Sequence, residues 1–366
     1  MNLNQRFKWV QEFTQTQLDH FTGAAIPSIY FNPQGELAHV ISNLKRLHYK
    51  YRPTPWLSNT HAHLVYFDKI RKKTVKLEYD FIEQLTMSDG GTTGIAWYGM
   101  HLPAETPTIL VLHTITGSPA SMRELVRDLH QVTGWRIALC LRRGHAGLPL
   151  SVPKINLFGN TQDLREQIEH IQQRLPYSKL YAVGSSAGTG LLVRYLGEEE
   201  SSTPIQAAFA LCPGYNTETG FSNVHPFYSR LMAKKLNAHF LKPYEQHWRN
   251  LESLKQLSVA KDLFDFEKTY YQFAGFENYD AYCKATNPIY VFEKIRVPLM
   301  ILNSEDDPVC HIRNLEPYKE VIQHMPNMAV VTTKKGSHCC FYEGNKNPES
   351  WAHKLIAEFF LELEKA

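Results

Sequence analysis

The hydrophobic and polar positions of this chain change their rhythm along its length. Residues 75–81 have a period of two and predict a half-exposed strand; residues 87–91 predict a turn, and residues 95–98 complete an opening hairpin. Beyond it, continuous apolar runs alternate with helix-compatible stretches. The predicted strands cover residues 108–113, 136–141, 180–183, 207–211, 298–302 and 329–332, and the predicted helices cover residues 121–132, 161–175, 315–324 and 350–364. Apolar strands that alternate with helices predict an α/β fold with a mostly parallel sheet covered on both faces.

Residues 215–292 interrupt this alternation. They contain no strong strand pattern and are rich in aromatic residues. Because the segment is inserted between two strands, on the side where we expect the active site, it is predicted to be a helical lid. Most of its rings are expected to form a small core of their own, and a minority to contact a substrate.

Residues 1–72 precede the alternating pattern and predict a mostly helical extension. Helices are expected over residues 2–20 and 36–47, and the proline-rich residues 51–57 predict a loop. The expected organisation is therefore an extension (1–72), a first part of the core (73–214), a lid insertion (215–292) and a second part of the core (293–366).

Composition and charge narrow the class of protein. The chain has 366 residues, of which 43% are hydrophobic, and a formal charge of +3 without a basic cluster, so we expect no nucleic-acid partner. Six cysteines without zinc-site spacing favour a reducing compartment. The polar start and the lack of a long apolar run predict a cytoplasmic protein, with peripheral membrane contact left open. The pair His61 and His63 lacks further ligands nearby, and no metal or cofactor is expected.

A nucleophile elbow is predicted at residues 184–188, which read Gly-Ser-Ser-Ala-Gly between an apolar strand and a helix-compatible stretch. In this setting Gly-x-Ser-x-Gly places its central serine at a sharp turn, and the small neighbours let strand and helix approach closely. Ser186 is the candidate nucleophile, and Ser185 is interpreted as a small filler.

A serine nucleophile needs a histidine to take its proton and a carboxylate to orient that histidine. The order serine, acid, histidine is expected for this arrangement. Asp306 and Asp307 follow the strand at 298–302, and His338 lies on a glycine-containing loop after the last strand. Asp306 is preferred as the acid because it comes three residues after Asn303, the expected strand end, and Asp307 stays as the alternative.

An oxyanion hole requires two backbone N–H groups that face the developing negative charge. Ala187 directly follows the candidate nucleophile at the start of a helix, where the helix dipole favours an anion. The second N–H is expected from the loop at residues 113–118, with Ile115 as the candidate.

The chain resembles the alpha/beta-hydrolases, and within them the type-four branch. That branch includes bacterial and yeast esterases and animal hydrolases of monoacylglycerols and phospholipids. The resemblance covers roughly residues 50–362. It is carried by residues 55–59 (Pro-Trp-Leu-Ser-Asn), 112–118, 141–147 (Leu-Arg-Arg-Gly-His-Ala-Gly), 159–165 (Gly-Asn-Thr-Gln-Asp-Leu-Arg), 183–188, 261–266, 275–276 with Tyr279 and Tyr282, and 306–308.

The resemblance implies hydrolysis of carboxylic esters through an acyl-serine intermediate, without a cofactor. It implies small esters, acylglycerols or phospholipids with short- to medium-chain acyl groups as substrates. Acyl transfer to an alcohol and non-catalytic binding of a small apolar ligand remain alternatives, and the oligomeric state stays open. The chain departs from the family at His113-Thr114, where relatives commonly carry a glycine, at Thr60 before His61, and at Cys339-Cys340 after the histidine.

Overall fold

A central sheet organises the molecule in the computed structural model, which describes residues 3–249, 251 and 254–365, with side chains from residue 13 onward. Within these residues the sheet has nine strands in the order β1-β9-β8-β7-β6-β4-β5-β3-β2. Strands β5, β4, β6, β7, β8 and β9 pair in parallel, whereas β1, β3 and β2 join antiparallel at the two sides. The strands are β1 (Ser28–Phe31), β2 (Phe81–Thr86), β3 (Thr92–Tyr98), β4 (Thr108–Leu112), β5 (Arg136–Leu141), β6 (Leu180–Ser185), β7 (Ile205–Leu211), β8 (Leu299–Ser304) and β9 (Met328–Thr333).

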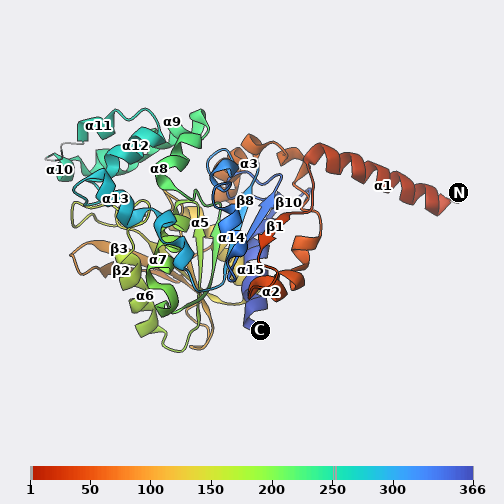
Figure 1. The fold of residues 1–366 in the computed structure, drawn as a ribbon, viewed down its shortest axis with the longest axis horizontal. Helices are drawn as coiled ribbons and strands as arrows, with labels where there is room; N and C mark the ends of the chain where they lie inside the picture. Colours follow the sequence, from red (N-terminus) through yellow and green to blue (C-terminus); the bar gives the residue numbers. More distant parts are fainter. Residues whose placement is uncertain (1–2, 250, 252–253, 366) are drawn as a thin grey trace.

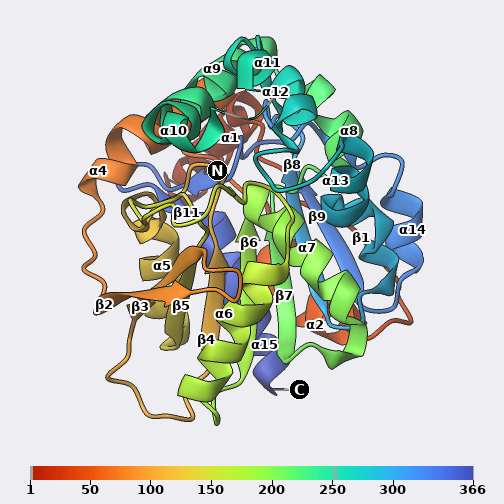
Figure 2. The same cartoon turned by 90° about the vertical axis from the view of Figure 1, so that its left-hand side faces the viewer.

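Helices cover both faces of this sheet (Figures 1 and 2). One face packs against α2 (Leu37–Asn43), α5 (Pro119–Thr133) and α15 (Trp351–Lys365). The other packs against α6 (Gln162–Arg174), α7 (Ala187–Glu199) and α14 (Lys319–His324). The strands β4 to β9 are therefore almost wholly buried, which explains their continuous apolar sequences. The predicted α/β fold with a mostly parallel, doubly covered sheet is confirmed.

The opening hairpin forms later in the chain than the alternating pattern predicts. Its first strand is β2 at Phe81–Thr86, whereas residues 75–80 form no strand. Phe81 pairs with Trp97 and Thr86 pairs with Thr92, so the ladder consists of the residues nearest the turn. Hairpin register is set by the turn, and the alternating residues before position 81 extend beyond the partner strand.

The N-terminal residues contribute a strand that the sequence does not predict. Strand β1 pairs antiparallel with β9 and forms one edge of the sheet, in addition to the helices expected in this part of the chain. The helices in this part are α1 (Leu3–Thr22), α2, α3 (Thr60–Tyr66) and α4 (Lys72–Thr74). Helix α1 extends away from the body of the molecule (Figure 1). Nowhere in the described residues is a helix both long and apolar enough to cross a membrane.

The segment between β7 and β8 contains helices, and its described residues contain no strand. Its α-helices are α8 (Thr217–Gly220), α9 (Pro226–Leu236), α10 (Glu245–Trp248), α11 (Leu254–Ser258), α12 (Leu263–Tyr270) and α13 (Tyr279–Thr286). Helices α9 to α12 lie together above the body of the sheet (Figures 1 and 2). Rings such as Trp248, Phe266 and Phe273 are buried in an apolar cluster that this segment shares with residues 150–158, and Phe221 lines a cavity beside Ser186.

Candidate active site

Ser186 occupies a strained turn between β6 and α7. Its φ and ψ are 53° and −118°, a backbone conformation that residues other than glycine rarely adopt. The Ser186 N–H donates to Leu211 O at 2.9 Å, which ties the turn to β7. A Cβ atom on Gly188 would lie 2.2 Å from Leu112 O, and one on Gly184 would lie 2.7 Å from Gly188 O. The two glycines therefore permit the close approach of strand and helix that the elbow motif predicts.

His338 joins Ser186 to Asp307 through two hydrogen bonds. Its Nε2 lies 2.8 Å from Ser186 Oγ, and its Nδ1 lies 2.8 Å from Asp307 Oδ2. The Asp307 side chain is fully buried, and its Oδ1 accepts the N–H groups of Val309 and Cys310. A buried carboxylate on Nδ1 leaves Nε2 as the proton acceptor that faces the serine hydroxyl.

The preference for Asp306 as the acid is wrong in this geometry. The Asp306 carboxylate accepts the Ser304 hydroxyl and the Ser337 N–H, and it makes no contact with the His338 ring. The reason lies in the strand end, because β8 extends to Ser304, one residue further than the expected end at Asn303. Three residues after the observed end is Asp307, the alternative acid.

Thr60 connects the loop that carries the acid to the loop that carries the histidine. Its hydroxyl donates to Asp306 O at 2.8 Å, and its carbonyl accepts the Ser337 hydroxyl at 2.9 Å. The histidine loop is strained, with φ values of 55° at Ser337 and 62° at Cys339. The N-terminal segment therefore holds the two loops together, a role that no local motif indicates.

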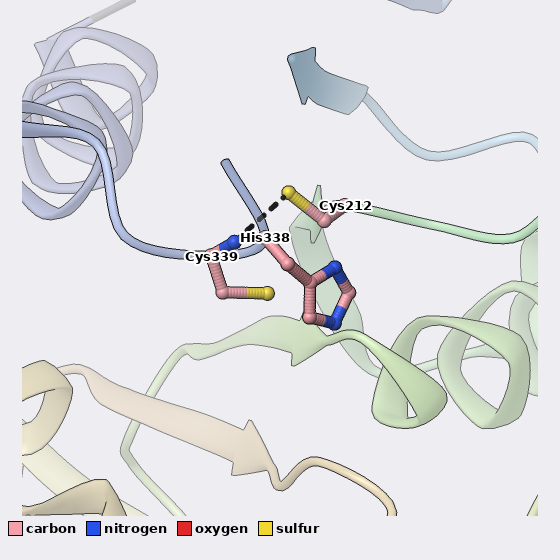
Figure 3. Close-up of side chains that lie close together, drawn as sticks. All are labelled: Cys212, His338 and Cys339. Carbon is pink, nitrogen blue, oxygen red and sulfur yellow. Dashed lines mark hydrogen bonds between the residues drawn. The ribbon is translucent and has the colours of Figure 1, made fainter. Parts of the chain in front are cut away.

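Thiol groups surround the catalytic histidine candidate. Figure 3 shows Cys212 and Cys339 beside His338, with the Cys339 N–H donating to Cys212 Sγ at 3.3 Å. Burial opposes ionisation of Cys339, but the Cys212 thiol and the charge of His338 outweigh burial and lower the pKa of Cys339. Burial also opposes the imidazolium form of His338, but the negative charges of Asp307 and Cys339 raise the pKa of His338 well above its usual value.

These side chains also have the donor atoms of a metal site. Ligand atoms of Cys212, His338 and Cys339 lie within 4.8 Å of one another, and Asp307, Cys310 and His338 form a second such group. However, Ser186 and Asp307 already occupy the two ring nitrogens of His338. We therefore assign no metal to this cluster.

The loop after β4 carries Ile115, one of the two expected oxyanion-hole residues. Ile115 and Ala187 both line the cavity beside Ser186. The Ile115 carbonyl oxygen lies 2.9 Å from His145 Nε2 and is therefore engaged within the protein. Ala187 is the first residue of α7, where backbone N–H groups have no partner within the helix.

Arg142 holds this loop through hydrogen bonds to backbone carbonyls, a role that the sequence did not indicate. Its buried guanidinium donates to Thr114 O at 2.6 Å, His113 O at 3.1 Å and Leu157 O at 2.6 Å. Burial lowers the pKa of Arg142 to about 9, so it stays charged at neutral pH. The signal that could have found it is an arginine directly after a continuous apolar strand, at the edge where the oxyanion loop lies.

A largely apolar cavity begins at Ser186 and Ala187. It runs beneath the helical insertion and along the face of the sheet covered by α7 and α14. Its lining residues include Phe158, Val193, Ala210, Phe221, Phe292, Leu299, Ile301, Ile322 and Met328. Such a cavity next to a serine–histidine pair suits an apolar ligand that carries a reactive polar group.

A serine on a strained elbow, in line with a histidine and a buried aspartate beside a doubly covered parallel sheet, defines a hydrolase-type fold. The sequence model for the alpha/beta hydrolase fold matches residues 107–345. The chain belongs to this family.

Relatives and solved structures agree with this membership. The chain is 28% identical to the medium-chain fatty acid ethyl ester synthase/esterase 2 of Saccharomyces cerevisiae, over 71% of this chain and 63% of that protein. It is 24% identical to human monoacylglycerol lipase ABHD2, over 92% of this chain and 85% of that protein. A structure from Staphylococcus aureus, of a protein with unknown function, shares the fold with a TM-score of 0.51 at 12% identity, covering 78% of this chain and 99% of that one.

Proposed function

We propose that this protein is a serine carboxylic-ester hydrolase that acts through an acyl-serine intermediate. The observation that carries the proposal is the continuous hydrogen-bonded line from Ser186 Oγ through His338 to Asp307 Oδ2. A serine hydroxyl is a weak nucleophile alone, and this line supplies the base that takes its proton and the carboxylate that orients the base.

In the proposed reaction, His338 Nε2 takes the Ser186 proton as Oγ attacks the ester carbonyl. The N–H groups of Ala187 and Ile115 stabilise the negative oxygen of the tetrahedral intermediate. His338 then gives its proton to the departing alcohol, leaving the acyl group on Ser186. Water, activated by the same histidine, releases the acid and restores the serine. These steps need no cofactor.

The proposed substrates are small esters, acylglycerols or phospholipids with short- to medium-chain acyl groups. The apolar lining of the cavity supports an acyl chain as its occupant. The names of the yeast and human relatives, an ethyl ester synthase/esterase and a monoacylglycerol lipase, support the same class.

We also propose a cytoplasmic location, which suits the six free cysteines. Peripheral membrane contact through the helical lid is proposed as well, because Phe227 on α9 is 57% exposed.

Turnover of p-nitrophenyl butyrate and labelling by a fluorophosphonate test the proposed reaction. Ser186→Ala is expected to abolish both, whereas Ser185→Ala is the matched control, because Ser185 Oγ faces Cys339 Sγ at 3.6 Å rather than the His338 ring. Turnover or labelling that survives in Ser186→Ala would overturn the proposal. Binding of an apolar ligand without any serine labelling would instead favour the non-catalytic alternative.

Acyl transfer to an alcohol is the second candidate, favoured by the apolar cavity and by the name of the yeast relative. The acyl-serine would be the same, and the alcohol would replace water in the second half of the reaction. The ratio of ethyl ester formed to acid released, measured at rising ethanol concentration, separates transfer from simple hydrolysis.

A further inference from the structure

The cavity beside Ser186 extends toward the opposite end of the sheet. From the elbow it descends along the sheet, between α7 and the residues 286–292 on one side and α14 on the other. Figure 2 shows α7 and α14 on the face of β7 to β9 that is turned toward the viewer. The cavity therefore runs parallel to the strands, as well as beneath the helical insertion.

Small side chains on β7 and α7 leave the space for this descent. On the cavity side of the sheet, β7 carries Ala208 and Ala210, whereas its opposite face carries Phe209 and Leu211. On α7 the cavity wall is formed by Gly190 and Val193. A Cβ atom at Gly190 would meet only Phe158 O, at 3.7 Å, so the wall is open at this position.

The far end of the descent is closed. Leu299, Ile322 and Met328 line it, and each is only 1% exposed. Two polar side chains along the cavity are engaged within the protein: Asn216 donates to Tyr318 Oη at 3.2 Å, and Thr286 Oγ1 donates to Tyr282 O at 2.8 Å. A blind apolar channel of this kind suits an unbranched alkyl chain.

We infer that this channel binds the acyl chain of the substrate and that its depth along the strands limits the length of the chain that it accepts. The inference rests on the proposed function. The leaving alcohol must escape to solvent while the acyl group stays on Ser186, so the blind arm suits the acyl chain and the lid side suits the alcohol.

The strand register gives the depth. Ser185 pairs with Leu211, which pairs with Leu302, and Leu299 lies three residues below Leu302 and pairs with Met328. Ser186 is thus four residues above the closed end, or about 13 Å at the rise of a parallel strand. An extended chain advances about 1.2 Å per bond, so the channel holds roughly ten carbons.

Two residues of α7 lie at different depths along the channel. The helix runs back along the sheet from Ala187, so Gly190 lies about 4.5 Å and Val193 about 9 Å below the elbow. At about 1.2 Å per bond these depths correspond to roughly four and seven carbons. A larger side chain at either position should stop the acyl chain at that depth.

The experiment is a series of p-nitrophenyl esters from acetate to palmitate. In the wild type, kcat/KM is expected to rise by up to about fourfold per methylene and to stop rising near ten carbons. Gly190→Leu should move the limit to about four carbons and Val193→Phe to about seven, each limit being measured relative to the acetate turnover of the same variant. Gly190→Ala and Val193→Ala are the matched controls for the substitution itself.

Met328→Ala should extend the limit beyond that of the wild type, and its Tm reports any loss of folding. Met232→Phe, on the lid side of the same cavity, should leave the chain-length limit unchanged. Identical limits in the Gly190 and Val193 variants, or limits in the reverse order, would overturn the channel even if acetate turnover depends on Ser186.

Calorimetry of decanoate with Ser186→Ala gives a readout that is independent of catalysis. Binding that is lost on adding Val193→Phe and kept on adding Val193→Ala supports the channel, whereas equal binding in both contradicts it. If no ester is hydrolysed but this pattern holds, the proposed function fails and the channel stands.

Discussion

Asp307 Oδ2 lies 2.8 Å from His338 Nδ1, while the adjacent Asp306 carboxylate accepts the Ser304 hydroxyl and the Ser337 N–H. Two neighbouring acids therefore have different surroundings, one on the imidazole and one within the loops. This difference makes them a matched pair for testing the proposed triad.

Asp307→Asn is expected to lower kcat by about 10³ to 10⁴, because the amide no longer fixes the tautomer of His338 or stabilises its charged form. Asp306→Asn should lower stability, with kcat of the folded enzyme within about tenfold of wild type, since it changes loop contacts and not the histidine partner. Steady-state kinetics beside urea unfolding separates the two effects. A larger loss of kcat in Asp306→Asn would contradict the assignment.

The activity should have an acid limb at higher pH than an ordinary histidine gives. Burial opposes the charged imidazole, but the charges of Asp307 and Cys339 outweigh this effect and raise the pKa of His338. Below that raised pKa the ring is protonated and cannot accept the Ser186 proton, so kcat/KM rises with pH and levels off above it. Cys339→Ala removes one of the negative neighbours and should move the limb to lower pH. Cys140→Ala, which replaces a buried thiol on β5, should leave it in place.

Arg142 should act as a positioning residue for the oxyanion loop. Arg142→Lys cannot reach the carbonyls of His113, Thr114 and Leu157 together. We expect kcat to fall by about 10²-fold with little change in KM, because the misplaced N–H acts on the transition state. The unpaired carbonyls should also lower the free energy of unfolding by about 1–3 kcal/mol.

Arg143→Lys is the control for this prediction. Arg143 pairs with Asp163 and Asp89, so its substitution should lower stability and leave kcat of the folded enzyme nearly unchanged. Equal effects of the two substitutions on kcat would argue against a special role for Arg142.

Glu267 should make the stability depend on pH. The side chain is fully buried in the insertion, Tyr279 donates to its Oε2 at 2.7 Å, and burial raises the pKa of Glu267 to about 8. Between its unfolded pKa near 4.3 and about 8, the folded state holds a proton that the unfolded state has released. The free energy of unfolding should therefore fall as pH rises through this window, by up to about 1.4 kcal/mol per unit.

Glu267→Gln has no proton to lose and should remove most of that slope. Urea unfolding at pH 5.5 and pH 8 measures it, with Glu277→Gln, on the loop before α13, as the control. A slope that persists in Glu267→Gln would show that another group titrates.

Local sequence patterns determined most of the core. The continuous apolar runs of β4 to β9 are long enough, and the helices between them regular enough, that burial on both faces follows from composition and period alone. The elbow motif was also readable locally, since Gly184 approaches Gly188 and Thr189 across the turn at Ser186, although Gly188 in turn approaches Leu112 O on the distant strand β4.

What the sequence did not decide depends on partners far away in the chain. Strand β1 exists because β9 offers a free edge about three hundred residues later, and no short pattern records that pairing. The choice of Asp307 over Asp306 required the end of β8, which is fixed by pairing with Thr333 on β9. Thr60, Arg142 and the depth of the apolar channel likewise emerge only when distant loops and strands meet. Local motifs identify the residue types that the chemistry requires, whereas packing between distant segments sets the positions of those side chains relative to one another.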